Sequence, residues 1–166
     1  MGKAPHTLQN TPMMHVYAIG RLRGEPEAVL FERYRARIRP ILSLTELPEA
    51  RGAPGEVKRR ESEALLAALP PRAFAVALDL GGEAPDSARF ARLLEQWLTA
   101  SRPVCFQIGG TEGLDGPVLE RADFILSLGS MTWPHFLARA MLAEQIFRAR
   151  AIAAGHPYHR AGRPGG

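Results

Sequence analysis

Cysteine is almost absent from this sequence, and long apolar segments are missing altogether. Cys105 is the single cysteine among 166 residues, so no disulfide can form within the chain, and its apolar neighbours are typical of a small buried thiol. No apolar run approaches the length of a membrane span, and residues 1–12 lack the apolar centre of a secretory signal. We therefore expect a cytoplasmic protein with no membrane partner.

Common patterns for phosphate and metal binding are also missing. Gly110 and Gly113 lack the lysine of a Walker loop, and the sequence has no GxGxxG fingerprint of a dinucleotide-binding fold. His135, His156 and His159 have no acidic or thiol partner at a spacing that suits a metal ion. We predict no metal site.

The composition favours a single domain. Hydrophobic residues make up 46% of the chain, which is enough for one proper core, and the length is too short for two. We place this domain at residues 14–160. Residues 1–13 are expected to be a disordered leader or a mistaken start, and residues 161–166 a flexible tail.

Positive charge is in modest excess and is clustered. The formal net charge is +4 and the sequence pI is about 9.8, which favours an anionic partner. A solvated helix face is the common explanation for one basic cluster, but three clusters in one small domain favour RNA, bound through its phosphates. The clusters are Arg33, Arg35, Arg37 and Arg39; Lys58, Arg59 and Arg60; and Arg148, Arg150, Arg160 and Arg163.

Apolar runs alternate with helical patterns along the chain. This alternation predicts an α/β fold with a mostly parallel sheet and helices on both faces. The apolar stripe of the first helix is expected to consist of Val29, Leu30, Tyr34 and Ile38. The glycine pair at 81–82 is expected to end the third strand. The expected strands are 15–19, 41–47, 74–79, 103–108 and 124–128, and the expected helices are 25–39, 56–69, 87–100, 117–121 and 134–154.

Three of the expected strands end in glycine turns. Leu78 and Asp79 precede one turn, Gly109 begins the second, and Leu128 precedes the third at Gly129. Ligands of parallel α/β sheets bind beyond the carboxyl ends of the strands, and glycine lets the backbone approach a ligand closely. We therefore predict a ligand site where these turns meet.

The third turn leads into the last helix. Pro134 has the backbone angle that suits a first helical position, and Thr132 could cap the helix with its side chain. A small-residue turn before a helix N-terminus presents free amides to a nucleotide-like or anionic ligand. An ordinary connection between a strand and a helix is the alternative explanation.

The last helix has two overlapping apolar stripes. Phe136, Ala140 and Phe147 lie on one, and Leu137 and Met141 lie near the other. One core cannot easily bury both, so we predict a homodimer through this helix. Gly155 is expected to cap the helix, and the segment 156–160 beyond it is either a disordered polar tail or a functional group of aromatic and basic residues.

Four motifs in order resemble the RlmH family, which are pseudouridine N3-methyltransferases of 23S ribosomal RNA within the SPOUT superfamily. The motifs are IGGTEGL at 108–114, LSLGSMTWPH at 126–135, EQIFR at 144–148 and PYHR at 157–160. The resemblance implies a C-terminal trefoil knot, a homodimer, S-adenosylmethionine as cofactor, and 23S RNA of the assembled ribosome as partner. Ordinary rules of chain topology would not predict the knot.

The resemblance also implies a set of site residues. His135 and the tail residues Tyr158, His159 and Arg160, donated across the dimer, would lie beside the target base. We expect His135 or His159 to act as base or proton relay and Arg160 to stabilise negative charge; helix capping or an internal hydrogen bond is the alternative for His135. The cofactor would contact Leu78, Gly109, Leu128, Gly129, Ser130, Met131, Thr132 and Trp133.

The sequence departs from the family pattern at both ends, in the leader and in residues 161–166 beyond the tail. Two other functions stay open. One is a ribosome-binding module without catalysis, and the other is a SPOUT methyltransferase that acts on a different RNA.

Overall fold

The computed structural model describes residues 13–160, in which five strands alternate with five helices. Residues 1–12 of the predicted leader and the predicted flexible tail, 161–166, lie outside the described residues. The elements are β1 (Met14–Ile19), α1 (Pro26–Arg35), β2 (Leu42–Leu47), α2 (Pro54–Ala68), β3 (Phe74–Glu83), α3 (Ser87–Thr99), β4 (Val104–Ile108), α4 (Gly116–Arg121), β5 (Phe124–Leu126) and α5 (His135–Ala153).

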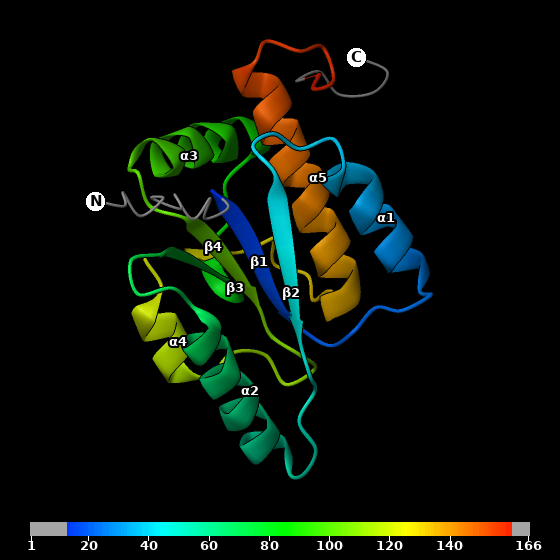
Figure 1. Ribbon diagram of the computed structural model, residues 1–166, viewed down its shortest axis with the longest axis vertical. Coiled ribbons are helices and arrows are strands. Elements are labelled where there is room, and N and C mark those ends of the chain that lie inside the picture. Colours follow the sequence, from blue (N-terminus) through cyan, green and yellow to red (C-terminus); the bar gives the residue numbers. More distant parts are fainter. Residues whose placement is uncertain (1–12, 161–166) are drawn as a thin grey trace, which may run out of the picture.

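The strands form one parallel sheet in the order β2-β1-β4-β3-β5 (Figure 1). The apolar runs of β1 and β4 take neighbouring places inside this sheet, where both faces are covered. The predicted parallel α/β sheet is confirmed. Because all the strands run the same way, the turns after β3, β4 and β5 leave the sheet at one edge.

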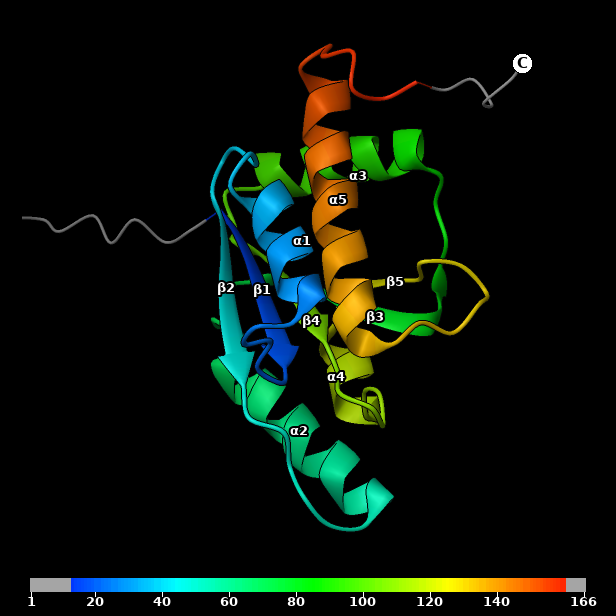
Figure 2. The same cartoon turned by 90° about the vertical axis from the view of Figure 1, so that its right-hand side faces the viewer.

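Helices cover both faces of the sheet, as predicted (Figures 1 and 2). Alternate side chains of a strand point to opposite faces, so Val16 and Phe106 join the core beneath α1, α3 and α5, whereas Ile19 and Cys105 join the core beneath α2 and α4. Burial raises the pKa of the Cys105 thiol to about 11. This thiol is therefore a protonated core residue.

The first helix is shorter than predicted and buries a different face. α1 ends at Arg35, and the amide of Ile38 bonds the carbonyl of Arg35 over 3.1 Å in a tighter turn that precedes Pro40. Val29 is 63% exposed, whereas Phe31 is buried. Leu30 is also exposed, at 36%. The predicted apolar stripe was therefore wrong at Val29 and Leu30.

The third strand does not end at its glycines. β3 continues to Glu83, and both Leu78 and Glu83 pair with Leu126 across a bulge. A Cβ on Gly82 would lie 2.5 Å from the carbonyl oxygen of Ile125. The glycine therefore permits close approach to β5, so its role differs from the termination that we predicted.

The start of α5 also corrects an expectation. Pro134 is the N-cap residue, His135 is the first helical residue, and no side chain caps the helix. The predicted cap by Thr132 is therefore wrong. At the other end Gly155 has φ +69° and its amide bonds the carbonyl of Ile152 over 3.1 Å, which confirms the predicted glycine cap.

Neighbouring helices bury much of the apolar surface of α5. α1 packs on one side of α5 and α3 on the other, and Ala143 and Phe147 are buried within the chain. Leu137 and Met141 stay half-buried. Leu137 and Met141 therefore leave apolar surface that a partner could cover. The homodimer remains a prediction, as does the trefoil knot.

Candidate active site

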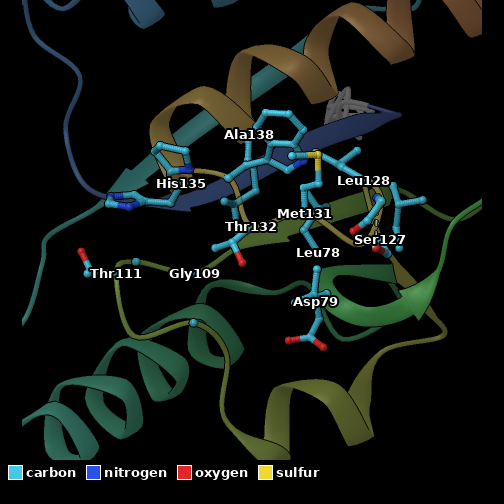
Figure 3. A pocket seen from close by; sticks show the side chains of 18 residues that line it. Leu78, Asp79, Gly109, Thr111, Ser127, Leu128, Met131, Thr132, His135 and Ala138 are labelled. Atoms are coloured by element: carbon cyan, nitrogen blue, oxygen red, sulfur yellow. Dashed lines mark hydrogen bonds between the residues drawn. The ribbon is translucent and has the colours of Figure 1, made fainter.

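A cavity of about 790 Å³ opens beyond the carboxyl ends of β3, β4 and β5, beside the start of α5 (Figure 3). It is lined by Leu78, Asp79, Leu80, Ile108, Gly109, Gly110, Thr111, Gly113, Leu126, Ser127, Leu128, Gly129, Met131, Thr132, Trp133, Pro134, His135 and Ala138. Two of the three predicted glycine turns, after β4 and β5, thus meet in one hollow with Leu78, Asp79 and Leu80, which belong to the continuing strand β3. All the predicted cofactor-binding residues except Ser130 lie in its wall.

The third turn is held by a serine that sequence reasoning missed. Ser127 is 5% exposed, and its hydroxyl donates to the carbonyl of Gly129 over 2.9 Å and accepts from the amide of Gly129 over 3.2 Å. Gly129 has φ +114°, a backbone conformation that favours glycine. The side chain and the glycine together fix the turn before Met131 and Trp133.

The second turn is a tight glycine loop. The amide of Gly113 bonds the carbonyl of Gly110 over 3.0 Å, and a Cβ on Gly109 would lie 2.8 Å from the carbonyl of Gly113. Below this loop lies Glu61, which is 3% exposed and accepts a hydrogen bond from the amide of Ala50 over 3.0 Å. Burial raises the pKa of Glu61.

Two large apolar side chains remain exposed at the mouth of the cavity. Met131 is 69% exposed and Trp133 is 38% exposed. Exposed apolar groups around a hollow are typical of a binding surface. This rim is therefore suited to a ligand or partner that covers it.

His135 stands in the wall of the cavity at the first turn of α5 (Figure 3). Its Nε2 is buried, lies 3.7 Å from Glu49 Oε1, and has no hydrogen-bond partner among the described residues. Burial lowers the pKa of His135; Glu49 opposes this shift and Arg139 adds to it. The imidazole is therefore neutral at neutral pH and able to accept a proton.

The tail residues do not reach this cavity within one chain. The Tyr158 hydroxyl bonds Glu144 Oε1 over 3.1 Å, and His159 Nδ1 lies 3.2 Å from Arg148 Nη1. Figure 1 shows the tail at the far end of α5 from its first turn. The structure thus separates Tyr158, His159 and the exposed Arg160 from His135.

Two of the three basic clusters come together. α1 packs along α5, where Arg37 lies over the Phe147 ring at 4.5 Å and Arg150 Nε donates to the carbonyl of Arg39 over 2.9 Å. The first cluster and the described part of the last one thus share one end of this helix layer (Figure 2). Arg163, the remaining member of the last cluster, lies outside the described residues. The middle cluster lies on α2, where Arg59 and Arg60 pair with Glu56.

Sequence reasoning missed several other groups near the cavity. Thr111 lies in its wall, and so does Ala138 of α5. Asp79, which the sequence placed beside the first turn, lies in the wall as well. The second glycine loop gave no separate signal for Thr111. Arg139, a charge in the middle of an apolar helix, was an available signal.

The described residues hold neither a metal-ligand cluster nor a membrane-spanning helix. Among residues 13–160, no three His, Cys, Asp or Glu side chains are grouped so as to hold a metal ion. In the same range no helix is long and apolar enough to cross a membrane.

Comparison with known proteins identifies the family. Residues 13–159 match the family model described as "Predicted SPOUT methyltransferase". The chain belongs to the SPOUT methyltransferase family. Its curated relatives are similar over nearly their whole length. A protein of Gluconacetobacter diazotrophicus named "Ribosomal RNA large subunit methyltransferase H" is 66% identical, covering 91% of this chain and 99% of the relative.

Other relatives carry the same name. The protein from Acidiphilium cryptum is 55% identical, over 91% of this chain and 96% of the relative. These matches confirm the resemblance to the RlmH family, so this SPOUT protein is an enzyme of the RNA methyltransferase class. A solved structure, "SpoU Methyltransferase AviRb from Streptomyces viridochromogenes in complex with the cofactor AdoMet", aligns at a TM-score of 0.45 and 16% identity, over 84% of this chain and 58% of that chain.

Proposed function

We propose that this enzyme transfers the methyl group of S-adenosylmethionine to N3 of a pseudouridine in 23S ribosomal RNA, on the assembled ribosome in the cytoplasm. The observation that carries the proposal is the convergence of β3 at Leu78, the glycine turns after β4 and β5, and His135 in one cavity. The names of the curated relatives support large-subunit ribosomal RNA as substrate.

The cavity fits the cofactor in size and chemistry. Its volume of about 790 Å³ lies in the usual range for small-molecule sites, which pair apolar walls with a few polar groups. Leu78, Leu128 and Trp133 offer apolar surface to an adenosine group, and the carboxylate of Asp79 suits a cationic ligand. When bound, S-adenosylmethionine supplies a methyl group that its sulfonium has already activated for displacement.

The chain's own residues supply proton removal and charge stabilisation. N3 of pseudouridine must lose its proton before it becomes nucleophilic, and the neutral imidazole of His135 is the group in the cavity wall that suits this task. Arg160 of a second copy would stabilise negative charge on the ring oxygens, with His159 beside it. Tyr158, bound to Glu144, would hold this tail in place.

The basic surface supports RNA as the substrate. Arg37 and Arg39 of the first cluster lie near the tail that carries Arg160. Cationic side chains bind nucleic acid through its phosphates without reading sequence. A small enzyme with such a surface would take its specificity from the shape of the ribosome.

The decisive experiment is mass mapping of 23S RNA from a strain that lacks this gene, before and after complementation. Complementation should restore one N3-methylated pseudouridine. An unchanged map, with S-adenosylmethionine bound in a calorimetric titration, would point to another RNA. An unchanged map without cofactor binding would leave only a ribosome-binding module.

A further inference from the structure

Arg139 is a charged residue in the interior of the protein. It is 0% exposed and belongs to the second turn of α5. Its Nη1 bonds Glu46 Oε2 over 2.6 Å, and its Nη2 donates to the carbonyls of Ile19 and Gly20 over 3.2 and 2.9 Å. One guanidinium thus joins α5 to the carboxyl ends of β1 and β2.

Glu46 is itself held in place. Its Oε2 also accepts a hydrogen bond from the amide of Leu22 over 2.9 Å, so the loop after β1 holds the same carboxylate oxygen. Gly20 packs against the same helix, because a Cβ there would lie 2.8 Å from the Phe136 ring. Strand ends, loop and helix start are therefore tied together around Arg139.

This tie acts at the start of α5. The helix begins without a side-chain cap, although a free helix start leaves several amides without partners. His135 is one helical turn before Arg139, and its ring contacts that of Phe136 at 4.1 Å between centroids. Whatever fixes Arg139 and Phe136 therefore fixes the imidazole in the cavity wall.

A gain in stability does not explain why Arg139 and Glu46 form an ion pair in the interior. A buried ion pair loses hydration energy that its attraction barely recovers, and apolar pairs of the same size often stabilise a protein equally well. Orientation is a better explanation, because catalytic groups need side chains locked within about 0.5 Å of their productive position.

We propose that Arg139 and Glu46 are positioning residues that hold His135 in the cavity. This inference rests on the proposed role of His135 as the base. The charged groups that face the imidazole are Glu49, from the loop after β2, and Arg139 itself. Glu46 acts through Arg139 by balancing its charge and fixing its orientation.

The test is Glu46→Gln, which keeps the shape of the side chain and removes its charge. Loss of this anchor should lower kcat about tenfold or more, since small displacements of catalytic groups have effects of up to roughly 100-fold. KM for ribosomes and the Kd for S-adenosylmethionine should change less than about twofold, which is under 0.5 kcal/mol. Glu83→Gln is the matched control, because Glu83 also pairs with an arginine, Arg89, at the end of a strand.

A second readout does not depend on turnover. In Glu46→Gln the uncompensated charge of Arg139 should move the NMR titration of His135 to lower pH, with no such change in Glu83→Gln. A double variant, Glu46→Met with Arg139→Met, should stay folded yet show the same loss of kcat.

The outcomes separate the two proposals. Wild-type kcat and an unchanged His135 titration in Glu46→Gln would overturn the positioning role. Full activity of His135→Gln would instead overturn the base role, whereas a shifted His135 titration in Glu46→Gln would still support positioning.

Discussion

The hydroxyl of Tyr158 bonds the carboxylate of Glu144 within one chain, over 3.1 Å. The same carboxylate pairs with Arg148, which lies against His159. These contacts hold the tail on the later half of α5, whereas His135 begins the helix. One protomer therefore cannot place Arg160 beside its own His135 without releasing the tail, so the proposed site needs a second copy.

Subunit mixing tests this composite site. His135→Gln and Arg160→Ala should each be nearly inactive alone, while S-adenosylmethionine binding by Arg160→Ala stays close to wild type. Co-expressed with different tags and purified as a mixed dimer, the two variants should regain methyl transfer, because one of the two sites then has both residues.

Mixed dimers that stay inactive would show that Arg160 does not act across the dimer. A matched mixture of His135→Gln with wild type gives the reference activity. Sedimentation should also give twice the 18.2 kDa chain mass; a monomer that is fully active would contradict the composite site.

Removing the Tyr158 hydroxyl should loosen the tail. Tyr158→Phe keeps the ring against Phe147, at 4.7 Å between centroids, and loses the hydrogen bond to Glu144. We expect a cost of about 1 kcal/mol in the free energy of unfolding and slower methyl transfer. Urea unfolding at neutral pH measures the first effect.

The same phenol gives a signature at high pH. Burial, followed by the hydrogen bond to and the charge of Glu144, raises the pKa of Tyr158 to about 12 from its ordinary value of 10.0. Since the folded state holds the proton more tightly, this contribution to stability is complete below pH 10 and lost as pH rises toward 12. Wild type should therefore lose more stability over that interval than Tyr158→Phe, and equal losses would contradict the assignment.

Burial of His135 predicts activity in mildly acidic solution. Its folded pKa lies below the ordinary 6.5, so the neutral base persists at pH values where an exposed histidine is already charged. The acid limb of kcat should thus fall below pH 6.5. For the same reason His135 should lower the stability of the fold as pH drops from 6.5 through its folded pKa, because the unfolded chain binds the proton more readily.

His15 provides the control for these measurements. Burial lowers its pKa as well, but it bonds Thr45 Oγ1 over 2.7 Å and is absent from the cavity wall. His15→Gln should keep both the activity and the acid limb of wild type, whereas His135→Gln should be nearly inactive at every pH. A limb that follows His15 would contradict the proposed base.

Gly129 should be required for the cofactor pocket. Its φ of +114° makes Gly129→Ala strained by about 1–3 kcal/mol, although no atom lies within 4 Å of the added Cβ. We expect the turn to rearrange and the Kd for S-adenosylmethionine to rise roughly tenfold, or about 1.4 kcal/mol. Calorimetry measures the change, with Gly55→Ala in the equally open start of α2 as control.

The sheet could be predicted because its signals are local. Apolar runs such as 104–108 indicate buried strands without knowledge of their neighbours, and glycines mark the turns that follow them. The carboxyl-edge rule then places Leu78, Gly109 and Gly129 together, since all the strands are parallel. The convergence of these turns needed no contact information.

The remainder depended on contacts between distant residues. Arg139 and Glu46 are 93 positions apart, and nothing in the local pattern at 46 indicates a buried partner. β3 does not end at Gly82. This position needs a glycine because a side chain would collide with the backbone of Ile125 in the neighbouring strand, and the local sequence does not show that contact. Val29 fits a helical period and is nevertheless exposed, since α1 presents Phe31 to the core.

The most direct measurement is methyl transfer to intact ribosomes from a strain lacking this gene, using purified protein and S-adenosylmethionine with an isotopically labelled methyl group. Mass analysis of the digested 23S RNA should find the label at N3 of one pseudouridine, with none transferred by His135→Gln. Bound cofactor with no label in ribosomal RNA, or label at another nucleotide, would contradict the proposed function.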